Sequence, residues 1–180
     1  MDMYKLKFTK LQQEMLRLLF VKAGMSFNER GIARLLKVSP TAISNSLNAL
    51  EKEKLIVVLK DAESKRLSIQ LNRENPKIFM LKRAENLKMI YESGLVEYLT
   101  EKFPSATIIL FGSYSFGEDT IHSDIDIAVI GAKQKEAALE KFDILLERTI
   151  FLQFYASLKE INKNLRENIL NGIVFKGAVK

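Results

Sequence analysis

The stretch LFGSYSFGEDTIHSDIDIAVIG, residues 110–131, decides how the second half of this 180-residue chain folds. Its first residues complete a continuous apolar run, 106–111, which predicts a buried strand. A second run, 123–130, predicts another strand beside the first. Asp124 and Asp126 are two positions apart on that second strand, so we expect both side chains to leave the same face of the sheet.

These residue types predict a site for a metal ion and a triphosphate. Two carboxylates on one rigid strand suit Mg²⁺, a hard cation that proteins usually share with substrate phosphates. Gly112 and Ser113 open a short helix or turn, where backbone N–H groups and the Ser113 hydroxyl can hold phosphate oxygens. Gly-Ser alone is also typical of an ordinary turn, and Asp-x-Asp alone is typical of a solvated strand edge. Together they predict nucleotide binding at Gly112 and Ser113, with Asp124 and Asp126 as metal ligands and catalytic residues.

The pattern resembles the DNA polymerase β superfamily of nucleotidyltransferases, and most closely its minimal nucleotidyltransferases. The likeness covers about residues 95–178 and includes the closing ENILNGIVFKG, 167–177. It implies a small α/β domain with a mixed sheet, and Mg²⁺-dependent transfer of a nucleotidyl group from ATP or another NTP. Relatives of this type modify proteins, antibiotics or nucleic acid ends. Antitoxins among them adenylylate a partner toxin, so the resemblance also implies a protein acceptor or toxin partner.

One departure from the family pattern concerns the acceptor's proton. Members commonly carry a third carboxylate on the next strand, but the matching stretch TIFLQFY, 149–155, offers only Gln153. Glutamine cannot take a proton as a carboxylate would. Asp143, Glu147 and Glu160 are expected to be exposed helix charges. Two functions therefore stay open: transfer of a nucleotidyl group, or a degenerate domain that only binds or senses nucleotide.

The first half of the chain carries all of its excess positive charge. Residues 1–75 hold 14 Lys and Arg against 8 Asp and Glu, whereas residues 76–180 hold 14 of each. A basic half beside a neutral half favours a polyanionic partner, although the same charge also promotes solubility. Residues 9–21, 28–36 and 40–54 show helical spacing of apolar residues, and 55–60 with 67–71 predict a hairpin.

The third of these helices predicts a DNA contact. Ile43, Leu47 and Leu50 share the side that we expect to be buried. The opposite side is polar and free of acids, as a recognition helix requires. Basic side chains around the hairpin turn could meet phosphates or the minor groove. The DNA-binding residues predicted are Thr41, Ser44, Asn45, Asn48, Lys60, Lys65 and Arg66.

The run IARLLKVSPTAISNSLNALEKEKLI, 32–56, resembles the winged helix-turn-helix of prokaryotic transcription regulators. That likeness covers about residues 10–72 and implies binding to double-stranded DNA. A winged helix that only contacts other proteins is the alternative. A homodimer on DNA is a further expectation, because such regulators often read two half-sites.

The whole chain is therefore expected to have an α+β fold with three parts. These are a winged helix-turn-helix at 1–75, a helical connector at 76–103 and a minimal nucleotidyltransferase domain at 104–180. We expect one helix over 133–148 and another over 157–170. No apolar run reaches the roughly 18 residues of a membrane span, the first ten residues lack the apolar core of a signal peptide, and there is no cysteine, which together predict a cytoplasmic protein.

Overall fold

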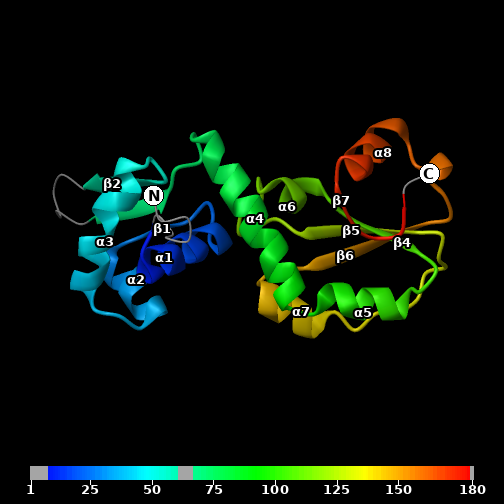
Figure 1. The fold of residues 1–180 in the computed structure, drawn as a ribbon, viewed down its shortest axis with the longest axis horizontal. Coiled ribbons are helices and arrows are strands. Elements are labelled where there is room, and N and C mark those ends of the chain that lie inside the picture. The colour runs from blue at the N-terminus through cyan, green and yellow to red at the C-terminus, as the bar shows by residue number, and fades with distance from the viewer. Residues whose placement is uncertain (1–7, 61–66, 179–180) are drawn as a thin grey trace, which may run out of the picture. The chain divides into compact units, whose positions relative to one another are not determined.

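The computed structural model describes residues 8–60 and 67–178, which fall into two compact units, Met1–Ile78 and Phe79–Lys180. Figure 1 shows the course of the chain through both. Within the described residues, no helix is both long and apolar enough to cross a membrane.

In the described part of the first unit, three helices and three strands precede the start of α4 (Pro76–Glu92). In chain order they are α1 (Lys10–Val21), β1 (Ser26–Phe27), α2 (Glu29–Leu36), α3 (Pro40–Lys52), β2 (Ile56–Lys60) and β3 (Leu67–Leu71). The strands form one antiparallel sheet in the order β1-β3-β2. This is the winged-helix fold, as the sequence predicts. The two-residue strand β1 was not expected, because so short a segment has no periodicity.

Polar caps set the starts of these helices. Thr9 and Gln12 form a reciprocal capping box at α1. Ser39 caps α3 by accepting from the N–H of Ala42 at 3.2 Å, and Pro40 occupies a first-turn position where a missing N–H is harmless. Gln12 also donates to the carbonyl of Ser46 at 3.4 Å, which connects α1 to the buried side of α3.

The second unit combines helices with a four-stranded sheet. Its elements are α4 (Pro76–Glu92, which begins within the first unit), α5 (Leu95–Lys102), β4 (Thr107–Phe111), α6 (Gly112–Phe116), β5 (Ile125–Ile130), α7 (Glu140–Leu146), β6 (Ile150–Tyr155), η1 (Leu158–Glu160), α8 (Lys163–Leu170) and β7 (Ile173–Lys176). The sheet order is β6-β5-β4-β7. Because β5 and β6 are parallel while β4 is antiparallel to both β5 and β7, the expected mixed sheet is confirmed.

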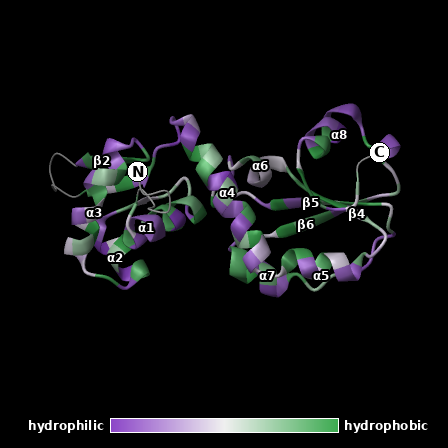
Figure 2. Cartoon of the chain, viewed as in Figure 1, coloured by the Kyte–Doolittle hydropathy of each residue, from purple (hydrophilic) through white to green (hydrophobic). Residues whose placement is uncertain are grey.

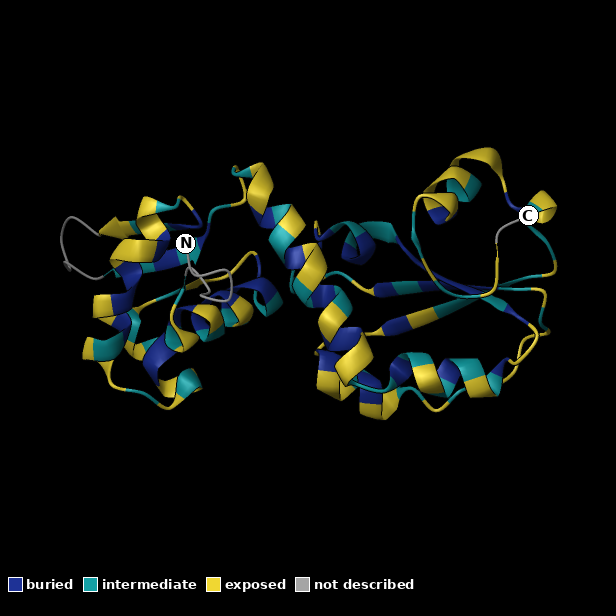
Figure 3. Ribbon diagram, in the orientation of Figure 1, coloured by how far each residue is buried: buried dark blue, intermediate teal, exposed yellow. Residues whose placement is uncertain are grey.

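This sheet has helices on both faces, and its central strands β4 and β5 are largely hydrophobic and buried, whereas the edge strands β6 and β7 are mostly half-buried (Figures 2 and 3). On one face Ile109, Phe111 and Ala128 pack with Ile161 and Ile169 of the α8 region. The opposite face carries the edge-to-face ring contact of Phe154 with Phe103, which follows α5. Helix α8 and the pair α5 and α7 accordingly lie on opposite sides of the sheet in Figure 1.

Two predicted helices were too long. The helix expected over 133–148 spans only Glu140–Leu146, and the one expected over 157–170 divides into η1 and α8. Asn162 starts α8 afresh, because its side chain accepts from the N–H of Leu165 at 3.0 Å and caps a new first turn. The apolar tail after Gly172 forms β7, which pairs with β4.

Candidate functional site

Gly112 lies directly against Asp126. The pairing of β4 with β5 places Phe111 opposite Asp126. The chain turns at the next residue, Gly112, which lies beside the carboxylate of Asp126. Its φ of +74° is a left-handed conformation, and a Cβ at this position would lie 2.8 Å from Asp126 Oδ2. Glycine is therefore needed both for the backbone turn and for the space beside the carboxylate.

The turn continues into the short helix α6. Ser113, partly exposed, is its second residue, and the Ser113 carbonyl accepts from the N–H of Glu118 at 2.9 Å. The N–H of Gly112 faces Asn168 Oδ1 of α8 at 3.4 Å. The structure thus brings Gly112, the first residue of the predicted phosphate turn, next to Asp126.

The two aspartates differ in their surroundings. Asp126 is half-buried in β5, whereas Asp124 is exposed and precedes the strand, which begins at Ile125 rather than at Ser123. Burial raises the pKa of Asp126 above its ordinary value, and the negative charge of Asp124 raises it further. A hydrogen bond from Gln153 opposes both effects on this pKa. Since a nearby cation favours ionised carboxylates, this pair suits Mg²⁺, and the Cβ-free approach of Gly112 leaves room beside Asp126 Oδ2.

Gln153 is held at both ends of its amide. Its Nε2 donates to Asp126 Oδ1 at 3.2 Å, and its Oε1 accepts from the hydroxyl of Tyr155 at 2.7 Å. Burial raises the pKa of Tyr155, and the charge of Asp126 raises it further, so the hydroxyl remains a donor. Tyr155 was not singled out from the sequence, although its position two residues after Gln153 on a strand puts both on one face.

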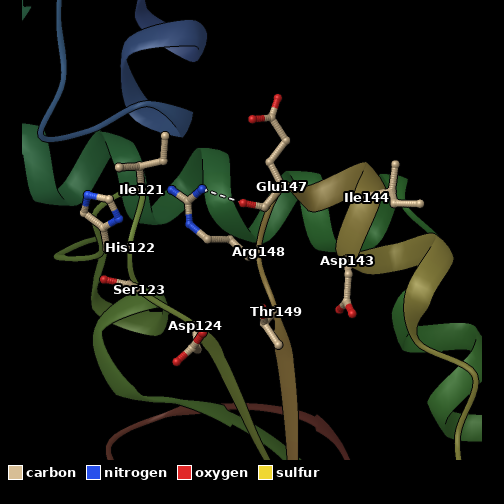
Figure 4. Close-up of a pocket in the computed structure, with 9 residues that line it drawn as sticks. All are labelled: Ile121, His122, Ser123, Asp124, Asp143, Ile144, Glu147, Arg148 and Thr149. Atoms are coloured by element: carbon tan, nitrogen blue, oxygen red, sulfur yellow. Dashed lines mark hydrogen bonds between the residues drawn. The ribbon is translucent and has the colours of Figure 1, made fainter.

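An open pocket of about 380 Å³ adjoins Asp124. Figure 4 shows Asp124 approaching from the segment before β5 and Asp143 from α7. Asp143 Oδ1 accepts from the N–H of Ile150 at 3.0 Å, so one of its oxygens is engaged in holding the start of β6. Asp126 does not line this pocket. The full lining is Ile121, His122, Ser123, Asp124, Asp143, Ile144, Glu147, Arg148 and Thr149.

A buried charged cluster lies beneath the loop that joins α6 to β5. Asp119, fully buried, accepts from Lys82 at 2.6 Å and from Asn86 at 2.7 Å through Oδ1, and from Arg148 at 3.3 Å through Oδ2. Asn86 also donates to the carbonyl of Tyr114 in α6 at 3.0 Å. These contacts fix the loop to α4 at one side and to the segment before β6 at the other. The sequence alone did not indicate them.

Gly117 brings the same loop against α4. Its φ is +76°, and a Cβ there would collide with the backbone of Phe79 and Arg83. Burial is the main reason that the pKa of the adjacent Tyr114 phenol is raised, with the charge of Asp119 adding to it and that of Arg148 opposing it. Helix α4 is therefore the support of the loop between the phosphate turn and Asp124.

The predicted DNA-binding face of α3 is exposed. Its opposite side, including Ile43 and Leu50, is fully buried in the first unit. Lys60 is exposed at the end of β2, and Lys65 and Arg66 lie outside the described residues. The predicted residues of this face, Thr41, Ser44, Asn45 and Asn48, are all exposed.

The described residues combine a winged helix with a mixed sheet, in which a Gly-Ser turn meets a strand that carries Asp126 of the Asp-x-Asp motif. Residues 92–174 match the model of the nucleotidyltransferase domain family, and this part of the chain is a nucleotidyltransferase domain. All of α4 except its last residue precedes the matched range.

The chain also has similarities to solved structures of bacterial regulators, all with TM-scores below 0.5. A MepR–DNA complex of Staphylococcus aureus is 25% identical, with a TM-score of 0.39, over 54% of this chain and 80% of that one. The adhesin competence repressor AdcR of Streptococcus pyogenes is 18% identical, with a TM-score of 0.41, over 54% and 69%. A mutant of ZitR from Lactococcus lactis is 21% identical, with a TM-score of 0.41, over 57% and 67%. A comparison with curated proteins gave no match.

Proposed function

We propose that this chain is a DNA-binding protein whose C-terminal domain binds a magnesium–nucleoside triphosphate and transfers its nucleotidyl group, AMP from ATP, to a protein or nucleic acid acceptor. The observation that carries the proposal is the approach of Gly112 to Asp126, where a Cβ would lie 2.8 Å from Oδ2. A turn with free space directly beside a strand carboxylate is what a phosphate-bridged cation requires.

Each residue of the site has a distinct part in this proposal. The N–H and hydroxyl of Ser113 hold phosphate oxygens, and the N–H of Gly112 exchanges its 3.4 Å contact with Asn168 Oδ1 for a phosphate oxygen. Asp124 and Asp126 hold the cation that the phosphates carry, and that cation stabilises charge on the phosphate oxygens. In the transfer itself an acceptor oxygen forms a bond to the α-phosphorus, the bond to the leaving oxygen breaks, and pyrophosphate departs with its electron pair.

The acceptor must also lose its proton during transfer, and Gln153 cannot take it. The neutral amide of Gln153 already donates to Asp126 Oδ1. This contact favours a second candidate, in which the domain binds or senses nucleotide for a DNA-binding transcription regulator and transfers nothing. Transfer by the first candidate is expected to be slow, unless the acceptor supplies its own ionised group.

Two measurements test nucleotide use. Calorimetric titration of the full chain with ATP is expected to show Mg²⁺-dependent binding, which Asp124→Asn with Asp126→Asn abolishes. The exposed Asn164→Asp variant on α8 serves as a surface control and should bind as the wild type does. Incubation with labelled ATP, Mg²⁺ and cell extract then separates the candidates. Label on a protein or nucleic acid supports transfer, and binding without any label supports sensing.

DNA binding is proposed from the first unit alone. The exposed residues Thr41, Ser44, Asn45 and Asn48 of α3 carry hydrogen-bonding groups, and the exposed acid Glu51 lies only in the last turn. Residues 1–75 supply the whole positive excess of the chain. A salt titration of duplex binding should show log affinity falling with log salt by about 0.9 per neutralised phosphate. Lys65→Ala with Arg66→Ala should weaken binding to every duplex, whereas Asn45→Ala should reduce discrimination between duplexes. No duplex binding even at low salt would contradict the proposal.

A further inference from the structure

The amide of Gln153 has a fixed orientation. The hydroxyl of Tyr155 donates to its Oε1 at 2.7 Å, so its Nε2 must face the other way. That nitrogen lies 3.2 Å from Asp126 Oδ1. With the amide reversed, two oxygens would face each other across this distance, which the observed orientation avoids. The side of the amide that faces the carboxylate therefore has hydrogens and no lone pair for a cation.

Gln153 occupies the place from which a third ligand would approach. Parallel strands β5 and β6 pair Asp126 with Phe151 and Ala128 with Gln153, so Gln153 lies one step along the same face as Asp126. A carboxylate at position 153 could share a cation with Asp126. The amide instead donates to Oδ1, while the opposite oxygen, Oδ2, is the one that borders Gly112.

The remaining acids near the site do not replace that ligand. Asp143 Oδ1 is engaged with the N–H of Ile150. The carboxylate of Glu147 points away from Asp124 in Figure 4. In the described residues, 8–60 and 67–178, no group of three or more His, Asp or Glu side chains is placed to hold a metal. Two metal ions about 3.5–4 Å apart repel strongly and need several shared anionic oxygens. The phosphates supply some of these, but in the described residues no third carboxylate joins Asp124 and Asp126 to supply the rest from the protein.

We propose that this site accepts one divalent cation, shared by the nucleotide phosphates with Asp124 and Asp126, and that Gln153 excludes a second. The inference rests on the proposed nucleotide site and adds its metal stoichiometry. The cation enters with the triphosphate and serves binding. The amide N–H of Gln153 faces Asp126 Oδ1, the oxygen that a second ion would otherwise share.

Equilibrium dialysis of the full chain with a labelled, non-hydrolysable ATP analogue and Mn²⁺ tests this inference, because it counts both ligands on the protein side. We expect one nucleotide and one Mn²⁺ per chain. Two Mn²⁺ per nucleotide would overturn the one-cation inference and leave the proposed nucleotide site intact. Absence of bound nucleotide would overturn the proposed site, and this inference with it.

Variants at position 153 test whether Gln153 is the reason that the site holds one cation. Gln153→Glu and the shorter Gln153→Asp should each raise the count to two Mn²⁺ per nucleotide. The control Gln134→Glu adds the same charge at an exposed position of the same unit and should leave the count at one. A folded Gln153 variant that binds nucleotide with a single Mn²⁺ would show that Gln153 does not set the stoichiometry. The wild-type count does not depend on how the variants fold.

Discussion

Lys82 Nζ lies 2.6 Å from Asp119 Oδ1, and the two side chains are almost completely excluded from solvent, at 2% and 0% exposure. Removing one partner of such a pair leaves a buried charge with less compensation, which typically costs about 3–5 kcal/mol. Lys82→Met should therefore strongly destabilise the second unit. Urea unfolding followed by tyrosine fluorescence measures this, because four of the five tyrosines lie in residues 79–180.

Lys88 provides the matched control on the same helix. Its Nζ lies 3.7 Å from Glu92, with both side chains about half exposed. Exposed pairs of this spacing contribute about 0.3–0.5 kcal/mol, so Lys88→Met should shift the unfolding midpoint only slightly. Equal losses of unfolding free energy in Lys82→Met and Lys88→Met would contradict a structural role for the buried cluster.

Gly112→Ala separates backbone strain from the space beside Asp126. Alanine in a left-handed conformation costs about 1–2 kcal/mol. Gly94, with φ +75° and no atom within 4 Å of a Cβ placed there, carries the same strain without the contact. Gly112→Ala should lose at least as much stability as Gly94→Ala, because it adds a close contact with Asp126 to the same backbone strain. Only Gly112→Ala should lose affinity for Mg²⁺–ATP, by about tenfold or more, which corresponds to 1.4 kcal/mol. Calorimetric titration of both variants measures their affinity for Mg²⁺–ATP. An unchanged affinity in Gly112→Ala would argue against phosphate binding at this turn.

Gln153→Glu should accelerate nucleotidyl transfer. A carboxylate at this position can take the acceptor's proton, and general-base catalysis typically contributes about 10²–10⁴-fold. Affinity for Mg²⁺–ATP should stay within a few fold of the wild type, since the phosphate turn is unchanged. The measurement is label transfer under single-turnover conditions. Rapid transfer by the wild type that this substitution leaves unaltered would place the base elsewhere.

The stability of the second unit should decline at alkaline pH partly through Tyr114. Burial raises the folded-state pKa of this phenol above its ordinary 10.0, so the unfolded chain ionises first. Its contribution is fully present below pH 10 and is lost as pH rises from 10 towards the folded-state pKa. Tyr114→Phe cannot ionise and should therefore flatten the decline. Urea unfolding of both proteins at pH 8 and pH 10.5 gives the comparison, and parallel declines would refute the assignment.

Regular patterns made much of this fold predictable from the sequence. The helical spacing of apolar residues in 9–21 and 40–54 located α1 and α3, and the run 106–111 located β4. The approach of Gly112 to Asp126 agrees with the predicted closeness of turn and strand. Short or interrupted segments were harder, because β1 has two residues and α8 restarts at its own cap.

Contacts between distant residues could not be predicted in the same way. Lys82 and Asp119 are 37 positions apart, and each looks like an ordinary surface charge in its local sequence. Only the packing of α4 against the loop makes them buried partners. Gln153 was noticed as a missing carboxylate, but its orientation depends on Tyr155 and on the register of β6 with β5, which a single sequence does not specify.

The position of α4 relative to the family match has a consequence for how such domains can be exchanged between proteins. The matched range begins at residue 92, yet Lys82 and Asn86 precede it and hold Asp119 inside it. A gene fusion joined at residue 92 would transplant the recognisable sequence without the cation and amide that its buried aspartate uses. The segment that folds with its buried charges paired is therefore longer than the matched range, and a fusion that preserves this domain must include α4.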